Sequence, residues 1–169
     1  FPWPAQRDDA QAVVEWVYKN IRQYGGDPRK IYLSGHSAGS NLTAILAYRD
    51  GWRKQRSLPM DVLKGAALTS AVASGPRKEI DDPVLSAETD VLRNTASPPR
   101  RNVLAAGGEE LKGEAGAVSR KATEQMARQL KAMGVTANVV FPPGLDHATL
   151  VLSLGDERSE LFKAMLAMI

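Results

Sequence analysis

A serine inside a glycine-rich turn is the residue of this chain best suited to nucleophilic chemistry. Ser37 stands in the run Gly35-His36-Ser37-Ala38-Gly39, which follows a short apolar stretch and precedes a segment with helical character. Between a strand and a helix, the pattern G-x-S-x-G holds its serine on a sharp, strained turn, with the hydroxyl exposed at the top of a sheet. Ser37 is therefore the predicted nucleophile, and the alternative is a glycine-rich turn with a capping serine.

The turn itself offers two further features that favour catalysis. Gly35 and Gly39 lack Cβ atoms, so we expect neighbouring backbone to approach both of them closely. The helix that follows directs its N–H groups and the positive end of its dipole back at the serine. Negative charge on a substrate oxygen would be stabilised there, and the Ala38 N–H is the predicted oxyanion donor.

The chain has only two histidines, so the choice of a general base is narrow. His36 lies inside the turn, where we expect its side chain to pack away from the serine as a structural residue. His147 follows the last predicted strand and can reach back toward the serine. His147 is therefore the predicted base, and the alternative is a surface loop histidine.

The acid that would orient this histidine has several candidates. Glu110 is the predicted partner if Gly107 opens the loop after the third strand as a Gly-x-x-acid turn, and Glu109 is the alternative. Asp81 and Asp82, after the preceding strand, are more distant options. A further aspartate directly precedes the histidine and would have difficulty turning back to its Nδ1.

These residue types allow acyl transfer through a covalent intermediate. His147 would take the proton of Ser37, the Oγ would attack a carbonyl carbon, and the Ala38 N–H with at least one other donor would hold the oxyanion. His147 would then protonate the leaving group, and water would repeat the cycle on the acyl-enzyme. We expect neither a cofactor nor a metal ion at this site.

Alternating helical and strand-like segments must position these residues. Helical spacing of apolar residues predicts helices over 8–24, from the turn to Asp50-Gly51, over 117–133 and at the C-terminal end. Short apolar runs predict strands over 30–34, 63–72, 102–106 and 136–141. This alternation indicates the α/β class with a mostly parallel sheet. Ligands bind outside the carboxyl ends of such strands, where the serine, the glutamates and the histidine all fall.

Two connecting segments are less regular. Residues 52–59 are charged and predict a loop. Across 73–100 the pattern weakens, although Asp82-Pro83 suits a helix N-cap and first helical position. The 73–100 segment is either a small cap that shapes the pocket or a connecting helix without contact to a ligand.

Composition and charge limit the remaining possibilities. The 169 residues predict a single domain, and the absence of cysteine excludes disulfides and thiolate catalysis. No apolar run approaches the roughly 20 residues that a membrane span needs. The net charge is +3, but its basic residues are scattered, with small clusters such as Arg53, Lys54 and Arg56, and Arg100 and Arg101. Without an aromatic-interleaved basic stripe, we expect a solvated surface and no nucleic-acid partner.

Three sequence runs resemble the α/β-hydrolase superfamily, in particular its small carboxylesterases and its kynurenine-formamidase-like and hormone-sensitive-lipase-like enzymes. They are residues 25–31 leading into the Ser37 turn, the pair Gly107 and Glu110, and residues 143–150 around His147. The resemblance implies an α/β-hydrolase fold with the order serine, acid, histidine. It also implies a small-molecule carboxylic ester as substrate, or an acyl amide such as a formamide.

The chain also departs from that family pattern. Ser40 replaces a second glycine that often follows the turn, and we expect no consequence. Glu110 stands where many members have aspartate. No His-Gly-Gly-Gly-type loop, which donates further oxyanion N–H groups, occurs in this sequence. The sequence therefore resembles the C-terminal part of a larger hydrolase, and we expect an upstream segment to complete the fold and the oxyanion hole.

Three alternatives stay open at this point. The first is a shortened homologue, which would leave the strand over 30–34 as an unpaired edge. The second is a non-catalytic binding protein with the same fold. The third is another acyl transfer on the same residues, such as transesterification. The sequence does not indicate an oligomeric state.

Overall fold

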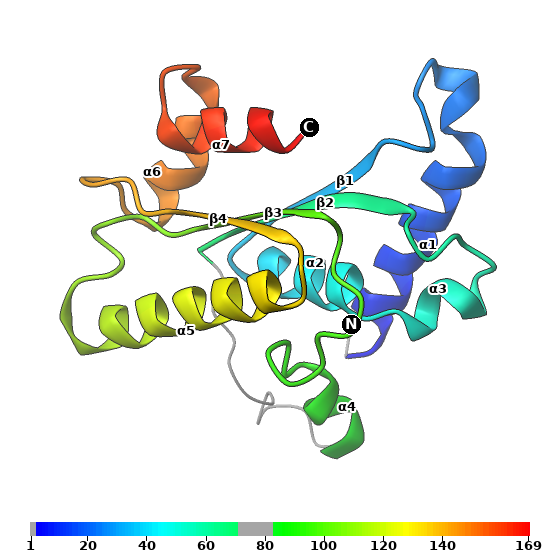
Figure 1. The fold of residues 1–169 in the computed structure, drawn as a ribbon, viewed down its shortest axis with the longest axis horizontal. Helices are drawn as coiled ribbons and strands as arrows, with labels where there is room; N and C mark the ends of the chain where they lie inside the picture. Colours follow the sequence, from blue (N-terminus) through cyan, green and yellow to red (C-terminus); the bar gives the residue numbers. More distant parts are fainter. Residues whose placement is uncertain (1–2, 71–82) are drawn as a thin grey trace.

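Four parallel strands form the sheet of this protein (Figure 1). The computed structural model describes residues 3–70 and 83–169. The strands lie in the spatial order of the chain: β1 (Ile31–His36), β2 (Leu63–Thr69), β3 (Arg101–Ala105) and β4 (Thr136–Val140). The predicted α/β class with a parallel sheet is confirmed, and all four strand predictions correspond to strands.

Helices cover both faces of the sheet (Figure 1). In the described ranges they are α1 (Ala5–Asn20), α2 (Ala38–Tyr48), α3 (Gly51–Gln55), α4 (Pro83–Glu88), α5 (Gly113–Ala132), α6 (His147–Leu152) and α7 (Glu160–Met168), with short 3-10 helices η1 (Ile21–Tyr24) and η2 (Ser153–Gly155). Helices α2 and α5 lie on one face, and α6 and α7 lie on the other. Within the described residues, no helix combines the length and the apolar character that crossing a membrane would require.

Two hydrophobic cores lie on opposite sides of the sheet because side chains alternate along each strand. In β2, Ala66 and Leu68 pack into the core beneath α2 and α5, whereas Ala67 packs into the core beneath α6 and α7. In β3, Leu104 packs into the core beneath α2 and α5, and Val103 packs into the core beneath α6 and α7. Both faces are covered, which explains why the strands read as nearly continuous apolar runs in the sequence.

A tight turn leads into β1. The Asp27 carboxylate accepts hydrogen bonds from the backbone and the side chain of Arg29, and these bonds lower the pKa of Asp27 to about 2. The Lys30 N–H donates to the Asp27 carbonyl at 2.9 Å. Before this turn, Gly25 ends the preceding 3-10 helix with a φ of 83°, as the sequence predicts.

Several element boundaries differ from the prediction, and three of these differences bear on the site or its surroundings. Strand β1 continues to His36 and does not stop at residue 34. The predicted loop over 52–59 contains the short helix α3, which is held by burial of Trp52 and Arg53 and has no strong helical pattern of its own. A further helix, α6, precedes the last one and begins at His147. The start of α6 is fixed locally by Asp146, which caps the helix.

Several apolar residues at helical spacing are exposed, contrary to expectation. Val118 at the start of α5 is 63% exposed, although Ala122, Met126 and Leu130 of the same helix are buried. Twenty residues of helix extend about 30 Å, whereas a five-residue strand such as β4 extends about 17 Å. One end of α5 therefore overhangs the sheet. Met133, Leu166 and Ile169 are exposed as well.

The segment that connects β2 to β3 is described in part. Residues 73–82, including Asp81 and Asp82, lie outside the described ranges. Pro83 is the first residue of α4, as predicted, and α4 lies on the α2 and α5 side of the sheet (Figure 1). Whether 73–100 forms a cap over the site stays a prediction.

A buried arginine anchors the end of this segment. Arg53 is 2% exposed, and its guanidinium donates to the carbonyls of Ala47, Met60 and Ser97. The Ala96 and Ser97 N–H groups donate to the carbonyl of Tyr48. These bonds tie the end of the segment to the C-terminal end of α2, where free carbonyls attract positive charge.

Candidate active site

Ser37 occupies a strained backbone position between β1 and α2. Its φ of 55° and ψ of −123° lie in a region that side-chain-bearing residues rarely adopt. The Ser37 N–H donates to the carbonyl of Thr69 in β2 at 2.9 Å, and the Ser40 N–H donates to the Ser37 carbonyl at 3.0 Å. Such strain persists only where the surrounding structure fixes it. The neighbouring strand and the first turn of α2 provide that restraint.

The two glycines of the turn have different surroundings. A Cβ at Gly35 would lie 2.3 Å from the carbonyl oxygen of Gly39 and 2.5 Å from Thr43 Oγ1. Gly35 therefore allows α2 to start directly against β1. A Cβ at Gly39 would meet nothing within 4 Å in the described part of the chain. The predicted close approach is thus confirmed at Gly35 and wrong at Gly39.

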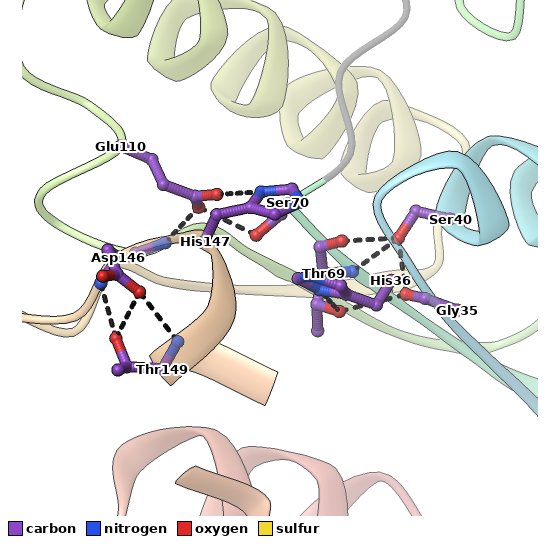
Figure 2. A network of polar contacts seen from close by, with 10 residues as sticks. Gly35, His36, Ser40, Thr69, Ser70, Glu110, Asp146, His147 and Thr149 are labelled. Atoms are coloured by element: carbon purple, nitrogen blue, oxygen red, sulfur yellow. Dashed lines mark hydrogen bonds and ion pairs between the residues drawn. The ribbon is translucent and has the colours of Figure 1, made fainter. Parts of the chain in front are cut away.

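Ser40 joins the two strands beneath the turn. Its hydroxyl is fully buried, accepts a hydrogen bond from the Thr69 N–H at 2.8 Å, and lies within donor reach of the carbonyls of Gly35 and Thr69 (Figure 2). The sequence alone indicates no role for this serine, and its neighbours in the chain offer no signal of one.

Glu110 and His147 are joined by a hydrogen bond between Glu110 Oε1 and His147 Nδ1 (Figure 2). The other carboxylate oxygen, Oε2, accepts from Ser70 Oγ and from the Gly107 N–H, both at 2.8 Å. The Glu110 side chain is 16% exposed and the His147 side chain 55% exposed. A shielded carboxylate thus faces an accessible imidazole, whose Nε2 is left for another partner.

The other acids predicted after the strands do not contact this histidine in the described structure. Glu109 is exposed, and its carboxylate pairs with Lys112 Nζ at 2.5 Å. Asp81 and Asp82 fall within 71–82, beyond the described ranges, so their placement is not tested. Of the two glutamates that the sequence left open, the structure pairs Glu110 with the histidine.

Asp146 has a different function from that of the acid partner. Its carboxylate accepts from the Thr149 N–H at 2.8 Å, and its own N–H donates to Thr149 Oγ1 at 2.8 Å. This reciprocal pair is a capping box at the start of α6, and the hydrogen bonds from Thr149 lower the pKa of the Asp146 carboxyl. Asp146 therefore fixes the first residue of α6, which is His147.

His36 contacts the candidate base, a neighbour that the sequence did not indicate. The ring centroids of His36 and His147 lie 4.6 Å apart at an interplanar angle of 48°. The cause is the extension of β1, because Tyr32 and His36 then face the side of the sheet that α6 and α7 cover.

The hydrogen bonds of His36 define its tautomer. Thr69 Oγ1 donates to the Gly35 carbonyl at 3.1 Å and lies 3.0 Å from His36 Nδ1. Since its only proton is used, Thr69 Oγ1 accepts from His36 Nδ1, which carries a proton. Burial lowers the pKa of His36, and the charge of His147 lowers it further, while Glu110 acts in the opposite direction.

The three residues predicted as a triad are therefore brought together in part. Glu110 and His147 are in contact, and His36 connects this pair to the turn that carries Ser37. The Ser37 hydroxyl forms no hydrogen bond with any residue in the described ranges. Catalytic hydrogen bonds are often long until substrate binds. Ala38 is the exposed first residue of α2, where helix N–H groups have no partner within the helix.

The glycine turn yields a prediction with its own matched control. We expect Gly35→Ala to lower the free energy of unfolding by at least about 2 kcal/mol, because the new Cβ overlaps backbone that cannot move freely. We expect Gly39→Ala to change it by less than about 1 kcal/mol, since alanine is the better helix former and the position is open. Urea unfolding of both variants measures the difference, and equal values would contradict the packing argument.

The environment of His36 yields a pH prediction. An unfolded histidine titrates near 6.5, and folding lowers the pKa of His36. Between the two values the unfolded state binds more protons, so the free energy of unfolding falls as pH drops from about 7 to about 5. We expect His36→Asn to make this fall shallower. Urea unfolding across that range measures it, and parallel curves for the two proteins would refute the expectation.

Comparison with known proteins places this geometry in a family. A family model described as the alpha/beta hydrolase fold matches residues 1–151. The carboxylesterase NlhH of Mycobacterium tuberculosis is 46% identical over 46 residues, which cover 27% of this chain and 14% of the relative. The fumonisin B1 esterase of Sphingopyxis macrogoltabida is 28% identical over 85 residues, which cover 50% of this chain and 15% of the relative.

Solved structures agree at the level of the fold. An arylesterase structure matches with a TM-score of 0.72 at 17% identity, covering 99% of this chain and 60% of the other. The Pyrobaculum calidifontis esterase matches with a TM-score of 0.69 at 21% identity, with the same coverages of 99% and 60%. This chain thus spans about three fifths of the length of these structures. The resemblance inferred from the motifs is confirmed, and the chain belongs to the alpha/beta hydrolase fold family.

Proposed function

We propose that this chain carries the catalytic residues of a serine esterase, with Ser37 as nucleophile, His147 as general base and Glu110 as the acid that orients the base. The observation that carries the proposal is the Glu110–His147 hydrogen bond, which lies at the same edge of the sheet as the strained Ser37 turn. The names of the relatives, which include a carboxylesterase, favour ester substrates over acyl amides.

The mechanism follows from the proton positions that the Glu110–His147 hydrogen bond imposes. A carboxylate only accepts, so Glu110 holds the proton on His147 Nδ1 and leaves Nε2 as the free base. Nε2 takes the Ser37 proton as Oγ bonds to the ester carbonyl carbon. The negative Glu110 then stabilises the imidazolium that forms, and its 16% exposure reduces screening by water.

The remaining steps complete hydrolysis. The oxyanion of the tetrahedral intermediate would accept from the Ala38 N–H at the start of α2, together with at least one further donor. The imidazolium of His147 protonates the departing alcohol, which leaves an acyl group on Ser37. Water, deprotonated by the same Nε2, then attacks the acyl-enzyme and restores the free serine.

A hollow that could take a substrate group adjoins Ala38, the residue that follows Ser37. This hollow of about 200 Å³ lies along the first turns of α2 and is lined by Ala38, Gly39 and Leu42, with Trp3 opposite. Its lining is largely apolar and adjoins the proposed oxyanion donor. An uncharged acyl or alkoxy group of a few carbons would match this lining.

The direct test uses the whole protein with p-nitrophenyl acetate and butyrate and with a fluorophosphonate label. We expect turnover of the esters and labelling at Ser37, and we expect Ser37→Ala to lose both. Turnover that survives Ser37→Ala would sink the proposed nucleophile. A folded protein that neither turns over nor labels would favour a binding protein with this fold.

The assignment of Glu110 as the acid can be tested against its neighbour Glu109, which allows the same substitution by glutamine. We expect Glu110→Gln to lower kcat by roughly 1000-fold or more, because the neutral amide neither fixes the Nδ1 proton nor stabilises the imidazolium. Glu109→Gln should leave kcat within about 3-fold of the parent, since Glu109 pairs only with exposed Lys112. Steady-state kinetics with one ester decide between them. Equal losses would exclude the assignment of Glu110.

The capping box gives a further prediction, in which the N-cap of α7 serves as the control. Asp146→Ala and Ser159→Ala each remove an N-cap side chain, and both should lower the free energy of unfolding by about 1 kcal/mol. Only Asp146→Ala should also lower kcat, by roughly 10-fold, because α6 starts with His147. Unfolding curves and kinetics on both variants test this, and a similar kcat in the two would argue against a link between the cap and the base.

A further inference from the structure

We propose that Ser70 is a positioning residue, which fixes the carboxylate of Glu110 so that one oxygen stays directed at His147. The inference rests on the proposed function and adds a residue that the sequence analysis did not select. Ser70 follows the last residue of β2, and its hydroxyl is drawn in contact with Glu110 in Figure 2.

Two donors on one oxygen determine the orientation of the whole carboxylate. Ser70 Oγ donates to Glu110 Oε2 at 2.8 Å, and the Gly107 N–H donates to the same oxygen at 2.8 Å. With Oε2 occupied from two elements, the carboxylate cannot rotate without breaking both bonds. Oε1 is thereby directed at His147 Nδ1.

The backbone of Ser70 supports this assignment independently. Its φ is 50°, a left-handed conformation that only Ser37 and Ser57 share among the non-glycine residues of the described ranges. Its N–H donates to the carbonyl of Ala105 in β3 at 2.7 Å. Glycine would adopt this conformation with less strain but would supply no hydroxyl. The strained serine keeps the donor at the end of β2.

Glutamate needs such a restraint more than aspartate does. Its side chain has one more rotatable bond, so more conformational freedom must be removed to keep one oxygen on the imidazole. Ser70 thus helps Glu110 to stay aligned while the proton of Ser37 moves to His147.

The experiment compares two strained serines with opposite roles. Ser57 has a φ of 54° and lies in an exposed turn after α3, so it reports backbone strain without contact to the site. The variants are Ser70→Ala, Ser70→Gly, Ser57→Ala and Ser57→Gly in the whole protein. Glycine should be the more stable substitution at both positions.

Catalysis should separate the two positions. We expect both Ser70 variants to lower kcat by roughly 10-fold with little change in KM, since the lost bond acts on the base and not on the bound ester. Both Ser57 variants should keep kcat within about 2-fold of the parent. On a Glu110→Ala background, Ser70→Ala should cause no further loss, because its target is gone.

A second measurement does not depend on turnover. The proton on His147 Nδ1 should give a far-downfield 1H NMR signal, which is assigned by its loss in His147→Gln. We expect Ser70→Gly to shift or broaden this signal and Ser57→Gly to leave it unchanged. This result would stand even if the Ser37 tests excluded an esterase, so the two failures are distinguishable.

Two results would overturn the inference. One is a Ser70→Gly protein with the parent kcat and an unchanged His147 signal. The other is a Ser70→Ala loss that is as large on the Glu110→Ala background as in the parent, because Ser70 would then act through another group.

Discussion

The strained backbone at Ser37 is the constraint on which the rest of the site depends. A φ of 55° is held because the Ser37 N–H bonds to the carbonyl of Thr69, and this bond requires β1 and β2 to be parallel and in the register that pairs His36 with Thr69. Gly35 lets α2 begin against the strand that precedes it. Local geometry at one residue therefore depends on the topology of the sheet.

The parallel topology of the sheet also explains why Glu110 and His147 lie next to each other. The loops after β3 and β4 open at the same edge of the sheet as the Ser37 turn, so Glu110 and His147 meet although 37 residues separate them. Their unequal exposure suits their roles. A carboxylate that is 16% exposed keeps its influence on the imidazole, and an imidazole that is 55% exposed remains accessible.

Sequence could predict the residues that follow a strand, because strand ends are marked by local patterns. Ser37, Glu110 and His147 were all selected in this way, and the last two are in contact. Ser70 fell inside the strand predicted over 63–72 and so was not recognised as a residue that follows a strand. The partners of Ser40 and Ser70 also lie far away in the chain. Similarly, the contact of His36 with His147 depends on two further residues of strand β1. Local patterns carry no information on such long-range placement.

The end of β2 connects the Ser37 turn to Glu110, although this strand supplies no group to the proposed chemistry. Thr69 binds the turn through its carbonyl, its N–H and its hydroxyl, and Ser70 binds Glu110. The Cα atoms of these consecutive residues are held about 3.8 Å apart by the peptide bond. A shift of the β2 end would therefore carry the nucleophile turn and the acid in the same direction. The covalent chain thus preserves the distance between them better than two separate loops could.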